Sequence, residues 1–255
     1  MSILRKNRGL AMRLNVMTFN IHHGRGIDGK LDLDRIAETI HKADADLVGL
    51  NEVDRQFSKR SQYQDQMLAL AERLGMEYAF GPTITIEQNK LGTKGEYGNG
   101  LLSRFPVTTC ENHLFRPIKG IENRGVLHVT VNLKGLPVNV FVTHLSLYPP
   151  LHKQQTNHVL NRVKYCSSPV IILGDWNMSP YGKRWRKVTR YMQDVWDAKG
   201  TGNGATFPAQ NPRSRIDYIF VSSHFCVEAV QVVNINREAS DHLPVQAVLR
   251  INGTN

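Results

Sequence analysis

The segment Val170-Ile171-Ile172-Leu173-Gly174-Asp175-Trp176-Asn177 is the strongest single indication of how this chain folds and what it does. Its apolar first half predicts a buried strand, and Gly174 permits a close turn where that strand ends. Asp175 and Asn177 are two residues apart, so they point the same way in an extended segment. An acceptor and a donor side by side can hold an attacking water and a phosphoryl oxygen. An Asx turn after the strand is the alternative.

Polar residues also follow or open apolar, β-prone runs elsewhere in the chain. These segments are Thr18–His23, Gly49–Asp54, Thr143–Leu145, Arg215–Tyr218 and Ser240–Pro244. Carboxylate, amide and imidazole groups gathered at one edge of a sheet meet the needs of a hard divalent cation and a phosphate. The combined pattern therefore predicts a metal-dependent phosphoesterase.

Glu52 follows Leu47-Val48-Gly49-Leu50, a run too apolar for a surface strand. A carboxylate at the end of such a strand suits Mg²⁺, which binds one or two carboxylates and keeps several waters. A capped or solvated glutamate is the alternative. Asn20 ends the first predicted strand, where its amide can hydrogen-bond the carboxylate or orient water. We expect both residues near a metal ion.

Asp217 is an acid within an apolar strand, and a buried carboxylate needs a partner. A histidine is the economical partner, because an Asp–His pair raises the imidazole pKa and orients the ring for proton transfer. His242, next to Asp241, and His144, after the run 138–142, supply imidazoles at strand ends. Because these positions share one structural context, we expect them to act together.

The histidines allow a second interpretation of the metal. His22 and His23, together with His144 and His242, could form a histidine-rich zinc site. The mixture of acids, asparagine and histidine favours oxygen-preferring Mg²⁺ or Mn²⁺ instead. The glycine-rich segment 24–29 does not resemble a phosphate-cradling loop that precedes a helix, so we expect a flexible connector there.

The composition fits a basic protein with a well-formed core. With 255 residues and 41% hydrophobic content the chain can bury a substantial core, and no apolar stretch reaches the roughly 20 residues that span a bilayer. The net charge of +10 favours polyanionic partners, namely nucleic acid, anionic lipid headgroups or phosphorylated small molecules, or it reflects only a basic surface. The 3 cysteines are widely spaced and no secretory signal is evident, which predicts a reducing, cytoplasmic location.

We divide the chain into a disordered basic arm, residues 1–12, and one domain, residues 13–255. Apolar spacing predicts helices over 33–41, 67–74, 151–165 and 181–190, the last one strongly basic. Strands are predicted over 13–20, 46–50, 98–104, 107–115, 125–134, 137–143, 170–173, 216–221, 226–233 and 243–250. This order predicts two sheets packed face to face with helices outside and the polar segments at one end. Specificity would lie in loops such as 54–66, 85–97 and 200–214.

At these residues the chain resembles the endonuclease/exonuclease/phosphatase superfamily, which includes pancreatic-type deoxyribonuclease, abasic-site endonucleases, inositol polyphosphate 5-phosphatases and bacterial sphingomyelinases. The similarity runs from about Arg13 to Arg250, with the motifs in the family order. The Gly-Asp-x-Asn and Ser-Asp-His motifs together, at the family's spacing, are highly specific. The resemblance implies an α/β fold, a four-layer sandwich of two packed mixed β-sheets flanked by helices.

The resemblance also implies a site. Its metal, Mg²⁺ or Mn²⁺, would be held by Asn20, Glu52 and Asp241. Its catalytic residues would be His144, Asp175, Asn177, Asp217 and His242. Weaker substrate or phosphate contacts would come from His22, Tyr97, Asn99 and Arg124. For Arg124, a structural salt bridge is the alternative.

Each catalytic residue has an implied role. Asp175 would orient or deprotonate the attacking water, or His242 would activate it, and Asn177 would bind the phosphate beside Asp175. His144 would hydrogen-bond the scissile phosphate, and Asp217 would hold His242.

The Asn20-Ile21-His22-His23-Gly24 opening looks like that of a bacterial branch, which also resembles the phosphodiesterase-like domain of proteins acting on glycosylphosphatidylinositol lipids. It departs from abasic-site endonucleases, which carry an acid where His22 stands. We therefore expect a metal-dependent phosphodiesterase in which activated water attacks in line. The alternatives are a nuclease acting on DNA or RNA, a phospholipase- or sphingomyelinase-like headgroup phosphodiesterase, and an inactive phosphate-binding module.

Overall fold

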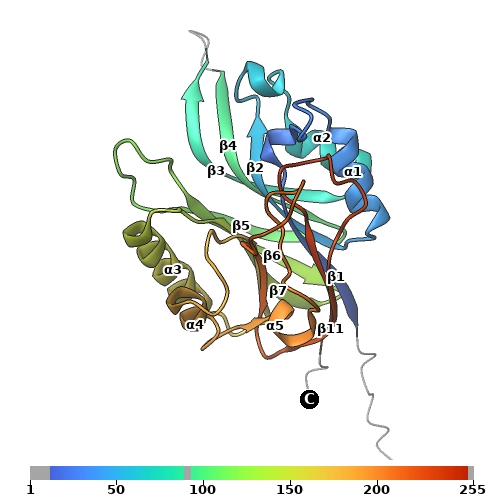
Figure 1. Cartoon of the computed structure of the whole chain (residues 1–255), viewed down its shortest axis with the longest axis vertical. Coiled ribbons are helices and arrows are strands. Elements are labelled where there is room, and N and C mark those ends of the chain that lie inside the picture. Colours follow the sequence, from blue (N-terminus) through green and yellow to red (C-terminus); the bar gives the residue numbers. More distant parts are fainter. Residues whose placement is uncertain (1–11, 89–92, 252–255) are drawn as a thin grey trace, which may run out of the picture.

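Two six-stranded sheets pack face to face in the computed structural model, which describes residues 12–88 and 93–251 (Figure 1). The first sheet has the strand order β11-β12-β1-β2-β4-β3. Its strands are β1 (Arg13–Asn20), β2 (Leu47–Arg55), β3 (Glu77–Glu87), β4 (Lys94–Ser103), β11 (Phe225–Val232) and β12 (Val245–Ile251). β1 and β2 run parallel and the other neighbours run antiparallel, so the sheet is mixed.

The second sheet follows the same plan, with the strand order β5-β6-β7-β8-β10-β9. Its strands are β5 (Val107–Leu114), β6 (Gly125–Leu133), β7 (Leu136–His144), β8 (Val170–Asp175), β9 (Gln193–Asp194) and β10 (Asp217–Val221). β7 and β8 form its parallel pair. Each sheet thus has two neighbouring parallel strands whose carboxyl ends lie at the same edge.

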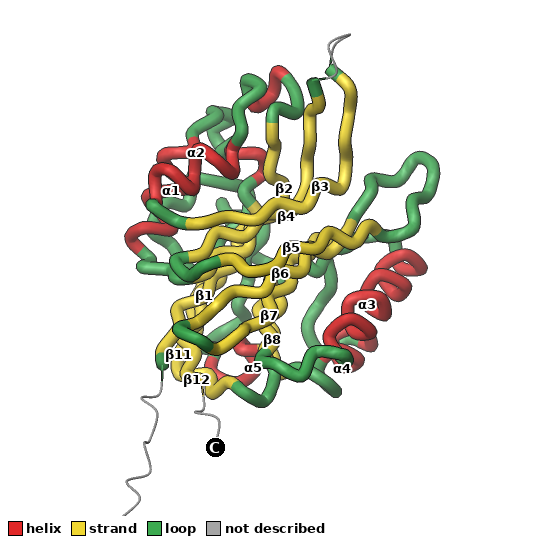
Figure 2. Tube along the Cα trace, turned by 180° about the vertical axis from the view of Figure 1, so that it is seen from behind, coloured by secondary structure: helices red, strands yellow, loops and turns green. Residues whose placement is uncertain are grey.

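Helices cover the outer face of each sheet (Figure 1, Figure 2). α1 (Leu33–Lys42) and α2 (Gln66–Leu74) pack on the first sheet. α3 (Pro149–Val163) and α4 (Lys183–Val188) pack on the second. The order helix, sheet, sheet, helix is the four-layer α/β sandwich that the sequence predicts, and the structure confirms it.

Shorter elements complete the chain. α5 (Val195–Lys199) lies against β10 and β11. Single 3₁₀ turns, η1 (His22–Gly24) and η2 (Lys59–Ser61), follow β1 and β2. Within the described ranges no helix combines the length and the apolar character needed to cross a bilayer.

Side chains that alternate along the strands build three apolar layers. Val16 of β1 and Leu173 of β8 meet in the core between the sheets. On the outer face of the first sheet, Phe19 packs with Ile36 of α1. On the outer face of the second, Phe141 belongs to the cluster that α3 and α4 cover. Because successive strand residues point to opposite faces, central strands serve two layers, and this explains their unbroken apolar sequences.

Sequence-based prediction misses β3. β3 and β4 stay paired out to Glu87 and Lys94, so the expectation of a loop over 85–97 is wrong for the part that is described. The prediction fails because Gly81 and Pro82 interrupt the apolar pattern. A proline fits here since β3 is the edge strand of its sheet, and the pairing shifts register directly after it.

Several boundaries also differ from expectation. The basic helix expected over 181–190 is shorter, because α4 ends at Val188. Most of the basic arm expected over 1–12 lies outside the described residues. Met12 itself belongs to the folded domain, since its carbonyl accepts a hydrogen bond of 3.0 Å from the N–H of Ile251.

Gly49 sets how closely the two sheets approach. It lies on β2 and faces β7 and β8, where a Cβ atom would stand 2.7 Å from Cβ of Leu173 and 3.3 Å from Cγ1 of Val142. The first distance is shorter than any ordinary contact between carbon atoms. A larger residue at position 49 would therefore force the sheets apart.

We expect Gly49→Ala to lower the free energy of unfolding by about 1–3 kcal/mol, the usual cost of an overpacked core. Urea denaturation of the purified protein measures this change. Ala229→Val adds volume at an exposed strand position and should stay within roughly 0.5 kcal/mol of wild type. If the two variants were equally stable, Gly49 would not limit the sheet spacing.

His152 is a buried histidine of α3, one of the helices that cover the second sheet. Its Nε2 lies 2.6 Å from the carbonyl oxygen of Trp176, and its Nδ1 lies 3.1 Å from Oγ1 of Thr156. A carbonyl only accepts, so Nε2 carries the proton and Nδ1 accepts from the hydroxyl. Burial lowers the pKa of His152, and the ring is neutral in the folded protein.

This lowered pKa makes stability depend on pH in a defined direction. Below about pH 6.5 the unfolded chain protonates His152 while the folded protein does not, so stability falls as the pH drops and is unaffected by this residue above that value. Urea unfolding between about pH 5 and 8 should give a shallower dependence for His152→Gln than for wild type. His41→Gln, at an exposed position, should show the same pH dependence of stability as wild type. If the pH dependence were equal in all three proteins, the assignment of a lowered pKa to His152 would be wrong.

Candidate active site

The strands that line the core between the sheets end in polar side chains on the same face. Along β7 the inward residues Val140 and Val142 lead to His144, and along β8 Leu173 leads to Asp175. Because a strand repeats every two residues, His144 and Asp175 both face the first sheet. They are also paired neighbours in the parallel ladder.

Asn20 and Asp217 close this polar end from both sheets. Asn20, the last residue of β1, places its Nδ2 3.3 Å from Oδ2 of Asp175. Asp217, the first residue of β10, pairs with Asp175 across the antiparallel ladder. The exposed fractions of these residues are 1%, 2% and 2% for Asn20, Asp175 and Asp217. Two carboxylates and an amide therefore meet where little water reaches them.

Asn51 joins the two sheets beneath Asp175. Its Oδ1 accepts a hydrogen bond of 2.9 Å from the N–H of Asp175. Its Nδ2 donates to Oδ1 of Asn99 at 2.8 Å and to the carbonyl of Thr143 at 3.2 Å. Sequence reasoning gives this residue no role. The signal that could have found it is its position two residues after Gly49, on the face of β2 that meets the second sheet.

His242 lies between two carboxylates. Its Nδ1 lies 2.9 Å from Oδ2 of Asp217, and its Nε2 lies 3.8 Å from Oδ2 of Asp175. Thr206 donates from Oγ1 to the same Asp217 oxygen at 2.5 Å, and the ring of Phe207 packs with its centroid 4.8 Å from that of the imidazole. Asp217 therefore orients His242 so that Nε2 faces Asp175.

The charges of this group follow from its surroundings. Burial opposes a charge on His242, but the carboxylates of Asp217 and Asp175 outweigh it and raise the pKa of His242 to about 10. Burial, and after it repulsion from Asp217, raises the pKa of Asp175. His242 is thus an imidazolium at neutral pH. Asp175 has its pKa moved toward neutrality, which is typical of a functional acid or base.

His144 has the opposite electrostatics. Arg124 donates from Nη1 to Nδ1 of His144, so the ring proton belongs on Nε2, which lies 3.4 Å from Oδ2 of Asp175. Burial, followed by the charge of Arg124, holds the pKa of His144 well below its usual value. Arg124 also forms an ion pair of 3.2 Å with Glu122. The salt bridge considered as the alternative is therefore present, and Arg124 contacts His144 as well.

Asn177 is fixed beside His144 by the turn after β8. Its N–H donates to Oδ1 of Asp175 at 3.0 Å, so the Asx turn considered as an alternative is present. Its Nδ2 donates to the carbonyl of Leu145 at 2.9 Å and lies 3.2 Å from Nε2 of His144. The backbone of Asn177 has φ 46°, a left-handed conformation that asparagine tolerates.

Glu52 stands where β2 becomes irregular. The pairing of β2 with β4 shifts register between Leu50 and Val53, and Glu52 has φ 59°. This bulge turns the carboxylate out of the normal alternation. Oε1 of Glu52 accepts a hydrogen bond of 3.1 Å from Nδ2 of Asn20 and lies 4.0 Å from Nδ1 of His144. Glu52 therefore borders the Asp175 cluster and remains partly accessible.

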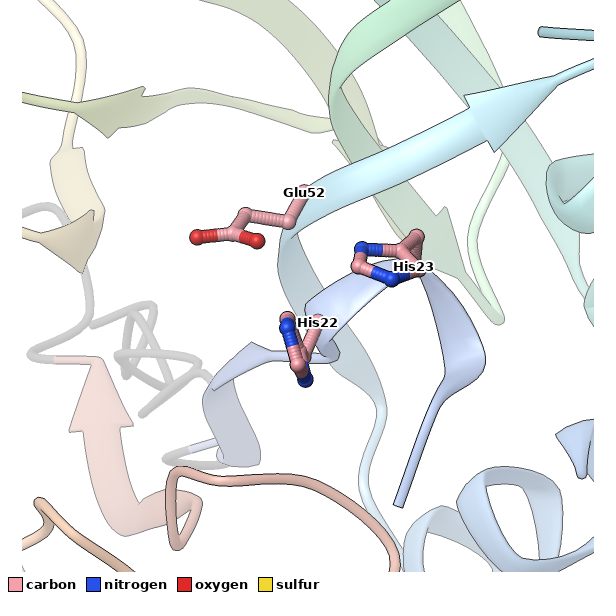
Figure 3. A group of neighbouring side chains, drawn as sticks. All are labelled: His22, His23 and Glu52. Carbon is pink, nitrogen blue, oxygen red and sulfur yellow. The ribbon is translucent and has the colours of Figure 1, made fainter. Parts of the chain in front are cut away.

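His22 and His23 belong to η1 and lie next to Glu52 of β2. Nδ1 of His22 lies 3.2 Å from the carbonyl oxygen of Arg25 and 3.9 Å from Oδ1 of Asp241. One nitrogen of each ring and one oxygen of Glu52 lie within 4.8 Å of one another (Figure 3). Burial, followed by the neighbouring His22, lowers the pKa of His23 to about 4. The His23 ring is therefore neutral.

A cavity of about 560 Å³ opens beside these groups. Its walls include His22, His23 and Asp241, together with the segments 25–29 and 208–210. The segment 25–29, expected to be a flexible connector, is held by backbone hydrogen bonds such as the one of 2.9 Å from the N–H of Gly26 to the carbonyl of Lys30. Of the predicted metal ligands, Asp241 lines this cavity.

Tyr97 and Asn99 lie on β4, at the border of the site. Tyr97 is buried under the guanidinium of Arg60, which lies 5.2 Å from the ring centroid. Burial, and after it the Glu52 carboxylate, raises the pKa of Tyr97. Asn99 donates to the carbonyl of Gly125 at 3.2 Å and accepts from Asn51 as described above. Its contacts are within the protein, and a substrate contact for Tyr97 or Asn99 stays a prediction.

The structure brings the predicted residues into one region at one end of the sandwich. The buried part contains Asn20 and the catalytic set except Asn177, which is half-buried like Glu52 and Asp241 at the accessible side. Their catalytic and metal-binding roles stay predictions. Besides Asn51, sequence reasoning misses Thr206 and Ser240, whose Oγ donates to the carbonyl of Asn20 at 2.7 Å. No sequence signal marks Thr206, because it acts through a distant partner, and the Ser-Asp-His motif that contains Ser240 gives this serine no role of its own.

Comparisons with known proteins agree with this fold. The sequence model of the Endonuclease/Exonuclease/phosphatase family matches residues 17–242, so the chain belongs to this family. Its members are phosphoesterase hydrolases and generally depend on divalent metals. The uncharacterized protein YbhP of Escherichia coli K12 is 26% identical over 259 residues, which cover 92% of this chain and 96% of YbhP.

Solved structures show the same architecture. The endonuclease/exonuclease/phosphatase from Beutenbergia cavernae DSM 12333 is 29% identical with a TM-score of 0.77, covering 94% of this chain and 72% of that chain. The mannosyl-6-phosphatase Bt3783 of Bacteroides thetaiotaomicron is 19% identical with a TM-score of 0.72, covering 92% and 99% respectively. At that identity the second likeness concerns the fold alone.

The bridge made by Asn51 gives a prediction about stability. Asn51→Leu keeps the approximate volume but leaves the N–H of Asp175 and the carbonyl of Thr143 buried without this partner. The free energy of unfolding should fall by about 1–3 kcal/mol for each group left unsatisfied. Urea unfolding measures this loss, and the exposed Asn211→Ala should cost no more than roughly 0.5 kcal/mol. Unchanged stability in Asn51→Leu would show that the bridge does not hold the sheets.

Proposed function

We propose that the protein is a divalent-metal-dependent phosphodiesterase in which an activated water attacks phosphorus in line. The observation that carries this proposal is the position of Asp175. Its Oδ2 lies 3.3 Å from Asn20, 3.4 Å from His144 and 3.8 Å from His242. A single carboxylate oxygen is thus surrounded by amide and imidazole groups, as water activation beside a phosphate requires.

The residues at the accessible side of the cluster fit a divalent cation. Glu52 and Asp241 supply carboxylates, and His22 and His23 supply imidazoles. Nδ1 of His23 is buried and has no hydrogen-bond partner among the described residues. Carboxylates and imidazoles that include a nitrogen without a hydrogen-bond partner are typical of the ligands of a metal ion. When bound, a divalent cation offsets negative charge on the phosphoryl oxygens.

Asp175 is the better candidate for the general base. Its raised pKa lets it accept a proton from water more readily than an ordinary aspartate does. His242 is charged at neutral pH and so cannot take that proton. It would instead donate from Nε2 to an oxygen of the phosphoryl group, while Asp217 keeps the ring in place. The sequence alone leaves this choice between Asp175 and His242 open.

His144 and Asn177 complete the proposed phosphate site. The neutral His144 presents its Nε2 proton toward Asp175, 3.4 Å away, and a phosphoryl oxygen that approaches this nitrogen can accept the proton in place of Asp175. Nδ2 of Asn177 lies 3.2 Å from that nitrogen, so both groups converge on the same region. Preorganised donors of this kind stabilise charge that develops in the transition state.

The cavity beside His22 favours a small polar leaving group. At about 560 Å³ it has the size of a ligand pocket, and it suits a sugar, a polyol or a lipid headgroup attached to the phosphate. A nuclease is the second candidate, which the net charge of +10 supports. An inactive phosphate-binding module is disfavoured because every motif position is occupied.

A substrate panel tests the proposal. DNA, RNA, phosphoinositide, sphingomyelin and sugar phosphodiesters are incubated with Mg²⁺ or Mn²⁺, with an EDTA control. We expect hydrolysis only with metal, and a rate at least about 10²–10⁴-fold lower for Asp175→Asn, because the general base is lost. Circular dichroism checks that this variant is folded. Full activity of Asp175→Asn, or no activity on any substrate, would reject the proposal.

Salt separates the two candidates. DNA binding by a nuclease should weaken with salt at a slope of about −0.9 per phosphate contact. Arg186→Ala, on the exposed side of α4, should then lower that slope by about one unit. A headgroup phosphodiesterase acting on neutral micelles should show a shallow dependence on salt, and Arg186→Ala should not change it.

A further inference from the structure

His22, His23 and Glu52 direct their side chains into one shared space (Figure 3). The two rings come from η1 and the carboxylate from the bulge of β2. Nitrogen and oxygen atoms from the three residues lie within 4.8 Å of one another. This spacing lets a single ion contact all three. Two imidazoles and one carboxylate are an unusual set for an ion that prefers oxygen.

The surrounding contacts prepare both rings for such an ion. The carbonyl of Arg25 lies 3.2 Å from Nδ1 of His22 and can only accept, so the proton sits on Nδ1 and Nε2 keeps its lone pair. A carbonyl in this position is the usual outer partner of a metal-bound histidine. For His23, the buried Nδ1 lacks a partner among the described residues.

The backbone holds these residues rigidly. His22, His23 and Glu52 have φ values of 44°, 45° and 59°. Left-handed conformations cost free energy and tend to occur at functional sites. Nε2 of Gln66 donates to the carbonyl of His23 at 2.7 Å, and Nδ2 of Asn20 donates to Glu52 at 3.1 Å. Each of the three residues is therefore fixed before any ion binds.

We propose that His22, His23 and Glu52 form a mixed imidazole–carboxylate centre that selects a divalent transition-metal ion, such as Mn²⁺, Co²⁺ or Zn²⁺, over Mg²⁺. The proposal rests on the proposed function and names its metal more closely. Imidazole binds transition ions well, whereas Mg²⁺ prefers six oxygen ligands. Asp241, 3.9 Å from His22, can add a further oxygen. This proposal departs from the sequence-based expectation of Mg²⁺ or Mn²⁺, because it disfavours Mg²⁺ and includes Co²⁺ and Zn²⁺.

Direct metal binding to the untagged full-length chain tests this without any substrate. After removal of metal by a chelator, titration with Co²⁺ followed by visible absorption, and displacement of the bound Co²⁺ by Mg²⁺, should show a Co²⁺ affinity on the order of 10-fold or more above that for Mg²⁺. His22→Asn should weaken Co²⁺ binding by about 10-fold or more. His22→Asp replaces an imidazole with a carboxylate, which is a ligand that suits Mg²⁺. This substitution should therefore reduce the difference between the affinities for Co²⁺ and Mg²⁺.

Two controls address the other histidines. His41→Asn changes an exposed residue of α1 and should bind Co²⁺ as wild type does. His113→Asn removes one member of a separate group formed by Glu111, His113 and His128 on the second sheet, and it should also bind normally. Because His23 is buried and its substitution could disturb folding, ring ¹⁵N resonances of the wild-type protein report on it instead. Zn²⁺ should shift those of His22 and His23.

The outcomes separate this proposal from the proposed function. Equal Co²⁺ affinity in wild type and His22→Asn, loss of binding in His113→Asn, or unmoved His22 and His23 resonances would each overturn the metal centre. Co²⁺ binding at His22 without hydrolysis of any substrate would reject the phosphodiesterase alone. Mg²⁺-dependent hydrolysis with Co²⁺ binding insensitive to His22 would reject the metal centre alone.

Discussion

The hydrogen bond from the N–H of Asp175 to Oδ1 of Asn51 is the interaction on which the rest of the site depends. Apolar packing between the sheets is strong but not directional, so it does not fix their relative position to within a hydrogen bond. Asn51 does so at the end where the polar groups begin. It also binds the carbonyl of Thr143, and it therefore holds the carboxyl ends of β7 and β8, with His144 and Asp175, against the first sheet.

Three site residues are buried to a similar degree, but their pKa values shift differently because their charged partners differ. Asp175, His144 and His242 are 2%, 5% and 6% exposed. A buried acid tends to stay protonated and a buried histidine tends to stay neutral. His144 follows this tendency because Arg124 adds a positive charge beside it, whereas His242 departs from it because Asp217 supplies a negative one. The pKa values of the two histidines are thus shifted in opposite directions within one buried cluster.

The sequence predicts the sandwich well because its central strands are read from local pattern. Val170-Ile171-Ile172-Leu173 shows a buried strand and Asp175 marks its end, with no need to know the neighbouring strand. Asn51 and Thr206 escape prediction because their importance comes from partners far away in the chain. β3 escapes because the proline that an edge strand tolerates looks like a break. Patterns along the chain report burial, but they do not report which groups will face each other.

The left-handed backbone at His22, His23, Glu52 and Asn177 restricts how this protein can diverge. β-branched side chains are strained in that conformation, whereas glycine, asparagine, aspartate and histidine are accommodated more easily. The substitutions that these positions tolerate are therefore mostly small polar residues, and most of these can still bind a cation or a phosphate oxygen. This framework can therefore carry different polar side chains at these positions while the fold beneath them stays the same.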